Sequence, residues 1–108
     1  GTKSAIDIHH IFPKHFLALQ GFDNDRDRNQ IANYTYLDYS TNIDISDNPP
    51  ADYVESYRKR LGEDGYKEAC AQNALPENFE NLEYMDFLVK RRKLMALLIR
   101  KAYKKLSD

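Results

Sequence analysis

The sequence predicts a small α+β domain, with a β-hairpin in its first part and helices in its second part. Two segments near the N-terminus, Ala5–Phe12 and Ile31–Leu37, are rich in β-branched and aromatic residues. After residue 50 the apolar residues recur at helical spacing instead. At 108 residues the chain has the length of one domain. We therefore expect a single domain over residues 1–108, divided into a hairpin part (1–50) and a helical part (51–108).

The first strand is predicted by isoleucines placed at every second position, Ile6 and Ile8, and by Pro13, which closes the segment. Residues 20–30 are too polar to bury and predict a loop. The segment Ile31–Leu37 then returns as the second strand of a hairpin, with Asn33 inside it.

A short helix is expected after the hairpin. Ser40 or Thr41 can cap its first turn, the helix carries Asn42, and it ends before Pro49 because a residue that precedes proline avoids helical geometry.

Three further helical segments are predicted. Asp52–Leu61 is followed by Gly62, a residue that favours a helix end, and Gly65–Ala74 is stopped near Pro76. A long amphipathic helix follows over Phe79–Leu106. Its apolar positions predict one buried stripe: Tyr84, Leu88, Met95, Leu98, Ala102 and Leu106.

Composition excludes several classes of protein. The single cysteine, Cys70, cannot form a disulfide framework within the chain or a zinc site with paired cysteines, and it favours a reducing compartment. No apolar run is long enough to span a membrane, and the N-terminus lacks a secretion signal, so we expect a cytoplasmic domain without a membrane partner.

The charge is unevenly distributed. Residues 1–89 contain 8 Lys and Arg against 16 Asp and Glu, whereas residues 90–108 contain 8 against 1. The basic end is either a solvated helix face that balances the acidic remainder or a contact surface for nucleic acid.

The consecutive histidines His9 and His10, at the end of the first strand, are the main candidates for chemistry. Neighbouring side chains of a strand point to opposite faces, so both rings reach one site only where the strand is short, twisted or irregular. An imidazole changes charge near neutral pH, so that a neutral ring can accept a proton from water. Imidazole and carboxamide groups can also bind divalent cations.

The motif resembles the active site of HNH endonucleases, whose fold is called ββα-metal. The resemblance covers about Ile6 to Pro50. It is closest to the C-terminal HNH domains of proteins that begin with a ParB-like nucleotidase domain, a group that includes modification-dependent restriction enzymes. The phrases that carry it are HHIFPK at 9–14, IANYTYL at 31–37, TN at 41–42, PPADY at 49–53 and FLVKRRKL at 87–94.

This resemblance implies a divalent-metal-dependent endonuclease that hydrolyses DNA. His10 would be the general base, and Asn33 would lie beside it and orient its ring through its side chain or backbone. His9 and Asn42 would bind one metal ion, expected to be Mg²⁺, with Mn²⁺, Ni²⁺ or Zn²⁺ as alternatives. Asp7 is either a carboxylate that does not bind the metal itself but fixes one of the imidazoles, or a charge at the strand end.

The chain departs from many HNH domains because it lacks the paired cysteines of a zinc knuckle. We therefore expect its helices to stabilise the motif. We also expect the chain to be a fragment of a longer protein, in which an N-terminal nucleotidase or recognition domain selects the DNA. The alternatives are a catalytically inactive HNH-fold module that binds nucleic acid or protein, and a domain whose metal is purely structural.

Overall fold

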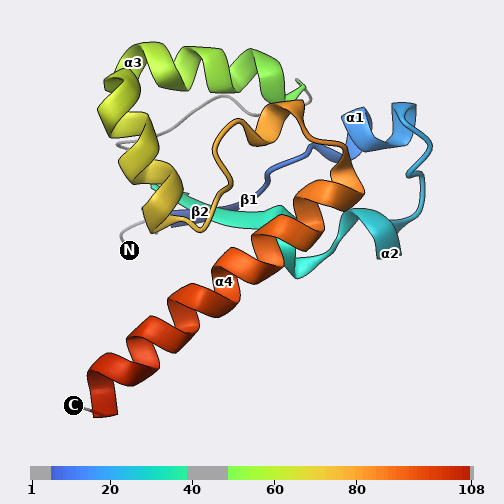
Figure 1. Cartoon of the computed structure of the whole chain (residues 1–108). Helices are drawn as coiled ribbons and strands as arrows, with labels where there is room; N and C mark the ends of the chain where they lie inside the picture. The colour runs from blue at the N-terminus through green and yellow to red at the C-terminus, as the bar shows by residue number, and fades with distance from the viewer. Residues whose placement is uncertain (1–5, 39–48, 108) are drawn as a thin grey trace, which may run out of the picture.

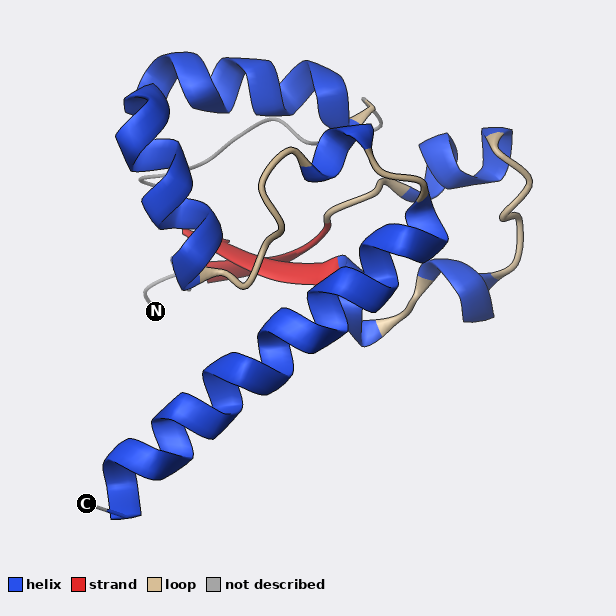
Figure 2. Cartoon of the chain, viewed as in Figure 1, coloured by secondary structure: helices blue, strands red, loops and turns tan. Residues whose placement is uncertain are grey.

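The computed structural model describes residues 6–38 and 49–107 (Figure 1). Two short strands lie among helices that account for most of these residues (Figure 2). The elements are β1 (Ile6–His10), α1 (Lys14–Leu19), α2 (Asp25–Arg28), β2 (Tyr34–Asp38), α3 (Pro50–Gln72) and α4 (Tyr84–Ser107), with 3₁₀ turns at Ile31–Asn33 and Phe79–Asn81. The predicted α+β class is therefore confirmed. The predicted short helix with Asn42 lies outside the described residues.

Strands β1 and β2 pair antiparallel, as the hairpin prediction requires. Ile6 lies opposite Asp38, and His10 lies opposite Tyr34. The chain bends at Ile11 and Phe12, and both side chains are buried in the core. The bend therefore leads the chain from the two histidines at the end of β1 into that core.

The connection between the strands differs from the prediction, because it contains two helices instead of a loop. In α1 the side chain of Leu17 is fully buried. The expectation of a loop over residues 20–30 is wrong at α2. This helix is capped by Asn24, whose side-chain oxygen accepts a hydrogen bond of 2.9 Å from the Asp27 amide. A local cap thus makes a helical turn from a segment whose composition alone predicts a loop.

The second strand begins three residues later than predicted, at Tyr34. Asn33 therefore lies in the 3₁₀ turn that precedes β2, where its amide donates to the Gln30 carbonyl at 2.8 Å. Its predicted place inside a strand is wrong. In this turn the Asn33 side chain faces the β1–α1 connection instead of a neighbouring strand.

The break predicted between two helical segments is present within α3. Gly62 has φ +76° and ψ 168°, a non-helical conformation that costs glycine little. The helix therefore changes direction at this residue, and Figure 1 shows its two arms, green and yellow, at a steep angle to each other. Both arms contribute to the core, through Tyr53 and Val54 from the first and Tyr66 and Cys70 from the second.

Aromatic side chains form half of the core cluster of buried residues. Phe12, which follows the histidines, packs on Tyr84 and Phe87 of α4 at ring-centroid distances of 5.5 and 4.7 Å. Tyr53 of α3 donates a hydrogen bond of 2.6 Å to the Ile11 carbonyl. These contacts agree with the expectation that the helices stabilise the histidine segment.

Helix α4 packs one face against the core over its first half only. It starts at Tyr84, five residues later than predicted, because residues 79–81 form a 3₁₀ turn. Tyr84 and Leu88 are 1% exposed, whereas Leu98 is 39% and Leu106 is 88% exposed. The prediction of one buried stripe along the whole helix is therefore wrong beyond Met95. Figure 1 shows this second half projecting from the body.

Candidate active site

The two histidines are the last two residues of β1, where the strand stops and the chain bends. Both lie in the regular strand pairing, so their side chains point to opposite faces of the sheet. His9 is opposite Thr35, and His10 is opposite Tyr34. Both histidines are partly exposed, so each retains access to solvent. The His10 ring packs on the Tyr34 ring at a centroid distance of 4.7 Å, with the planes tilted by 54°. This contact limits the movement of the imidazole ring.

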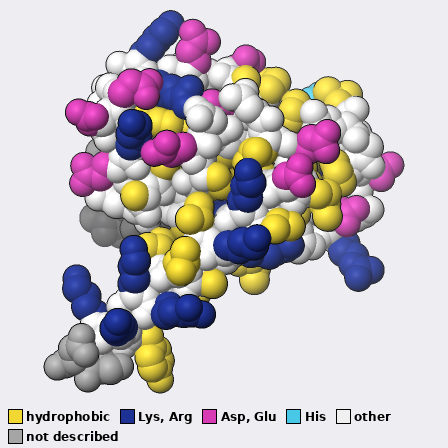
Figure 3. All heavy atoms as spheres, in the orientation of Figure 1, with side chains coloured by type: hydrophobic (Ala, Val, Ile, Leu, Met, Phe, Trp, Pro, Cys, Tyr) yellow, Lys and Arg dark blue, Asp and Glu magenta, His cyan; other side chains and the backbone are white. Residues whose placement is uncertain are grey.

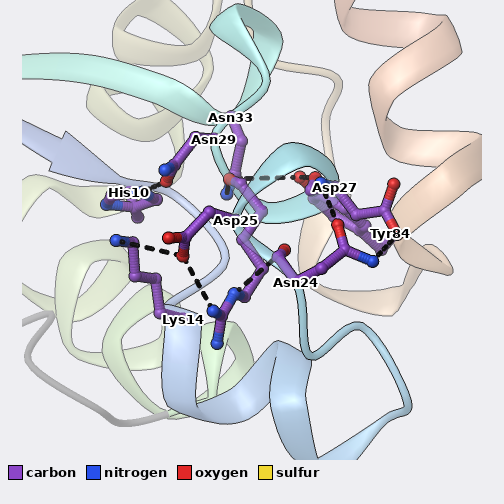
Figure 4. Close-up of polar contacts among 9 residues, drawn as sticks. His10, Lys14, Asn24, Asp25, Asp27, Asn29, Asn33 and Tyr84 are labelled. Atoms are coloured by element: carbon purple, nitrogen blue, oxygen red, sulfur yellow. Dashed lines mark hydrogen bonds and ion pairs between the residues drawn. The ribbon is translucent and has the colours of Figure 1, made fainter.

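The His10 ring is held by Asn29 through a hydrogen bond. Its Nε2 lies 2.8 Å from the side-chain oxygen of Asn29 (Figure 4). A carboxamide oxygen only accepts hydrogen bonds, so Nε2 must carry the proton in a neutral His10 ring. That tautomer has its unprotonated lone pair on Nδ1. The free nitrogen of His10 can therefore act as a proton acceptor.

Asn29 owes its position to α2, a one-turn helix fastened to the rest of the molecule from several sides. It follows α2 directly, and its amide donates to the Asp25 carbonyl at 2.8 Å. The Tyr84 hydroxyl donates to the Asp27 carbonyl at 2.6 Å, which ties the helix to α4. Lys14 forms an ion pair of 3.8 Å with Asp25, which ties it to α1. Asn29 is thus presented by a braced turn.

Asn33 stabilises the segments next to His10 and Asn29 through hydrogen bonds to their main-chain atoms. Its side chain accepts a hydrogen bond from the Phe12 amide at 2.8 Å and donates to the Phe12 carbonyl at 3.0 Å and the Arg28 carbonyl at 3.1 Å. Its own carbonyl accepts from the Ile11 amide at 2.8 Å, and the residue is 0% exposed. It therefore joins the segment after His10 to the end of α2.

That Asn33 orients the His10 ring through its side chain or backbone stays a prediction. The side chain hydrogen-bonded to the ring is that of Asn29, and Asn33 bonds to the main chain of Phe12 and Arg28. The sequence contains a pattern that predicts helix α2 and places Asn29 at its end, although the polar composition of residues 20–30 favours a loop. Asn24 is a typical N-cap, the Asp25–Arg28 pair has helical spacing, and Asn29 follows at the C-cap.

Of the two predicted metal ligands, His9 is described and Asn42 lies outside the described residues. The side chain of Asp7 also lies outside them. Among the residues that the structure describes, no group of three or more His, Cys, Asp or Glu side chains could hold a metal ion. The donor set proposed for the metal, one imidazole and one carboxamide oxygen, has the chemistry of a divalent-cation site with open positions for water and phosphate.

Buried polar side chains of α3 and α4 donate hydrogen bonds to the main chain around the site. Arg91 is 5% exposed and donates to the carbonyls of Ala32, Tyr34 and Asn73. Burial lowers the pKa of its guanidinium to about 10, which leaves it charged at neutral pH. Burial raises the pKa of Tyr53 and raises that of Tyr84 to about 12, so both hydroxyls stay protonated as donors.

Comparisons with known proteins do not identify a family for this chain. Protein-family models, curated proteins and solved structures were all searched, and none matches. In the part of the chain that the structure describes, no helix has the length and apolar character needed to cross a membrane.

Proposed function

We propose that this chain is an endonuclease domain that hydrolyses phosphodiester bonds in DNA with the help of one divalent metal ion, as its resemblance to HNH endonucleases implies. The observation that carries the proposal is the His10–Asn29 pair, which leaves Nδ1 of a partly exposed imidazole as the proton acceptor. A buried histidine with both nitrogens in hydrogen bonds would be a structural residue instead.

In this proposal His10 activates the water that attacks phosphorus. Nδ1 accepts a proton from the water, the resulting hydroxide forms a new P–O bond, and the bond from phosphorus to the 3′ oxygen breaks. The departing oxygen takes up a proton, which leaves a 3′ hydroxyl and a 5′ phosphate. Asn29 acts on His10 alone, as a positioning residue, because its oxygen accepts the Nε2 proton.

His9 and Asn42 are the residues proposed to hold the metal ion. When bound, a divalent cation stabilises the negative charge that develops on the phosphate oxygens. Mg²⁺ is the expected ion, with Mn²⁺, Ni²⁺ and Zn²⁺ as alternatives, because an imidazole ligand also suits transition metals. An HNH-fold module that has lost catalysis is the alternative function.

The test is nicking of modified and unmodified plasmid in Mg²⁺, Mn²⁺, Ni²⁺ or Zn²⁺ by the chain and by three histidine variants. His10→Ala should lose roughly 10²–10⁴-fold in rate, the usual contribution of a general base, and should still bind the metal. His9→Ala should lose both nicking and metal binding. His15→Ala is the matched control, since His15 is an exposed residue of α1, and it should nick like the wild type.

Two outcomes would contradict the proposal. Wild-type rates in both His9→Ala and His10→Ala would remove the assignment of the site. No nicking by the wild-type chain with any of the four metals, on modified and unmodified plasmid, would favour the inactive module.

A further inference from the structure

Lys14 is the first residue of α1 and returns the chain to the surface after the proposed catalytic histidine. The three residues between His10 and Lys14 are all buried, whereas the Lys14 side chain is 46% exposed. The side chains of His10 and Lys14 both approach α2. His10 bonds to Asn29, which follows the helix, and Lys14 pairs with Asp25 in its first turn.

The two contacts on α2 lie on the same side of this helix. Asp25 and Asn29 are four residues apart, and the Asn29 amide donates to the Asp25 carbonyl at 2.8 Å. Residues at this spacing are neighbours on a helix surface. Figure 4 shows the Lys14 ammonium group and the His10 ring facing this side of α2. The structure thus brings Lys14 to the edge of the His10 site.

The Lys14 ammonium group makes no hydrogen bond with the residues that the structure describes. Its contact with the Asp25 carboxylate, at 3.8 Å, is longer than a hydrogen bond. The same carboxylate oxygen accepts a hydrogen bond of 2.8 Å from Arg28, whose side chain is 17% exposed. Asp25 is therefore neutralised mainly by Arg28. The three donors of the Lys14 ammonium group remain available to solvent or to a ligand.

The charges of α1 and α2 leave an excess of one cation. The two helices carry Lys14, Arg26 and Arg28 against Asp25 and Asp27. The proposed proton acceptor is a neutral imidazole with a neutral carboxamide partner, so this pair supplies no charge to hold a DNA backbone. A positive charge at its edge is complementary to a phosphate, which carries one negative charge.

We propose that Lys14 binds a backbone phosphate of the DNA, next to the phosphate that is attacked at His10. This inference rests on the proposed function. A lysine ammonium group binds phosphate as a point charge with three donors, without requiring one fixed geometry. Phosphate contacts position a duplex but carry no sequence information. Lys14 therefore holds DNA of any sequence beside His10.

A larger group of cations lies on the projecting end of α4 and is the alternative contact for DNA (Figure 3). Near the site, α4 contributes Arg92, which donates to the Gln30 side chain at 3.0 Å. At 1.5 Å per residue, Lys104 lies about 18 Å further along the helix than Arg92. The cations of the projecting end are therefore too far from His10 to hold the attacked phosphate or its neighbour.

The first test measures binding of a fluorescent DNA duplex by anisotropy, without divalent metal, between about 50 and 200 mM salt. Loss of one phosphate contact lowers the slope of log K against log[salt] by about 0.9. Counted from about 1 M salt, this contact is worth about 15-fold in affinity at 50 mM and about fourfold at 200 mM. Lys14→Gln should show these losses, and Lys14→Arg should keep the wild-type slope. Lys59→Gln, at an exposed position of α3, is the matched control and should bind like the wild type.

The second test separates DNA binding from chemistry and from a structural role. In plasmid nicking, Lys14→Gln should raise KM by a similar factor with nearly unchanged kcat, whereas His10→Ala should lower kcat. The nitrogen NMR shifts of the His10 ring should stay at their wild-type values in Lys14→Gln, because the bond to Asn29 does not involve Lys14. Changed shifts would show that Lys14 acts by bracing α2 and would overturn the phosphate contact.

The outcomes distinguish this inference from the proposed function. A wild-type salt slope for Lys14→Gln would overturn the inference, even where the wild-type chain nicks plasmid. A wild-type chain that binds no duplex would also overturn it. A reduced slope for Lys104→Gln, with a wild-type slope for Lys14→Gln, would assign the contact to the end of α4 instead. A reduced slope for Lys14→Gln in a chain that nicks with none of the four metals would support the phosphate contact and contradict the nuclease activity.

Discussion

Replacing Asn33 with alanine should cost the domain much of its stability, although the change removes no apolar surface. The side chain makes three hydrogen bonds to main-chain atoms, two to Phe12 and one to Arg28, and none of its own surface is exposed. Alanine would leave the amide and carbonyl of Phe12 buried without these partners, at about 1–3 kcal/mol each. The Arg28 carbonyl keeps a weaker bond of 3.4 Å from Tyr84, so its loss is smaller.

The expected total is about 2–6 kcal/mol, because two groups lose their partners at about 1–3 kcal/mol each. A domain of this size has a free energy of unfolding of about 5–15 kcal/mol, so the variant should remain folded but unfold at much lower urea concentration. Urea unfolding followed by circular dichroism measures the difference. Asn29→Ala is the matched control, since it removes one exposed hydrogen bond and should cost less than about 1 kcal/mol. A cost below about 1 kcal/mol for Asn33→Ala would refute the reasoning.

Three further predictions concern catalysis, the core and pH. Asn29→Ala should slow nicking by up to about tenfold, the worth of one hydrogen bond of about 1.4 kcal/mol, with unchanged stability; nitrogen NMR shifts should show the His10 ring losing its preference for the Nε2-protonated form. An unchanged tautomer would show that Asn29 does not set it. Arg91→Lys should destabilise the domain by about 2–4 kcal/mol in urea unfolding, because one ammonium group cannot reach carbonyls on three segments as the guanidinium does; wild-type stability would refute this. Stability should fall as pH rises above about 10, because Tyr53 and Tyr84 keep their protons in the folded state whereas unfolded tyrosines lose theirs. The lowered pKa of Arg91 acts in the opposite direction, but it is one group against two. Urea midpoints that stay constant from pH 8 to 11 would contradict the prediction.

The sequence predicted those parts of the fold that depend on local periodicity and helix-breaking residues. The pairing of the histidine strand with the segment 34–37 follows from their apolar and β-branched residues. The break at Gly62 follows from the conformational freedom of glycine. The position of the two histidines at a strand end was also predictable, because Pro13 limits the strand.

Features that depend on tertiary contacts could not be predicted in the same way. Helix α2 is held by hydrogen bonds from Tyr84, which is distant in sequence, and from Asn33, which follows the helix. The partner of the His10 ring therefore comes from a segment that composition classes as a loop. Amphipathic periodicity predicts which face of α4 is apolar, but it does not say where the body ends beneath it. That is why Leu98 and Leu106 were expected in the core.

The contacts that hold α2 have a consequence for how this site can change during evolution. Tyr84 and Asn33 grip carbonyl oxygens of α2, which every amino acid possesses. The side chains at Arg26 and Asp27 can consequently be exchanged while those two anchors, and the turn that presents Asn29, stay in place. Substitutions at these two positions would therefore change the surface of α2 and leave the hydrogen bond between Asn29 and His10 in place.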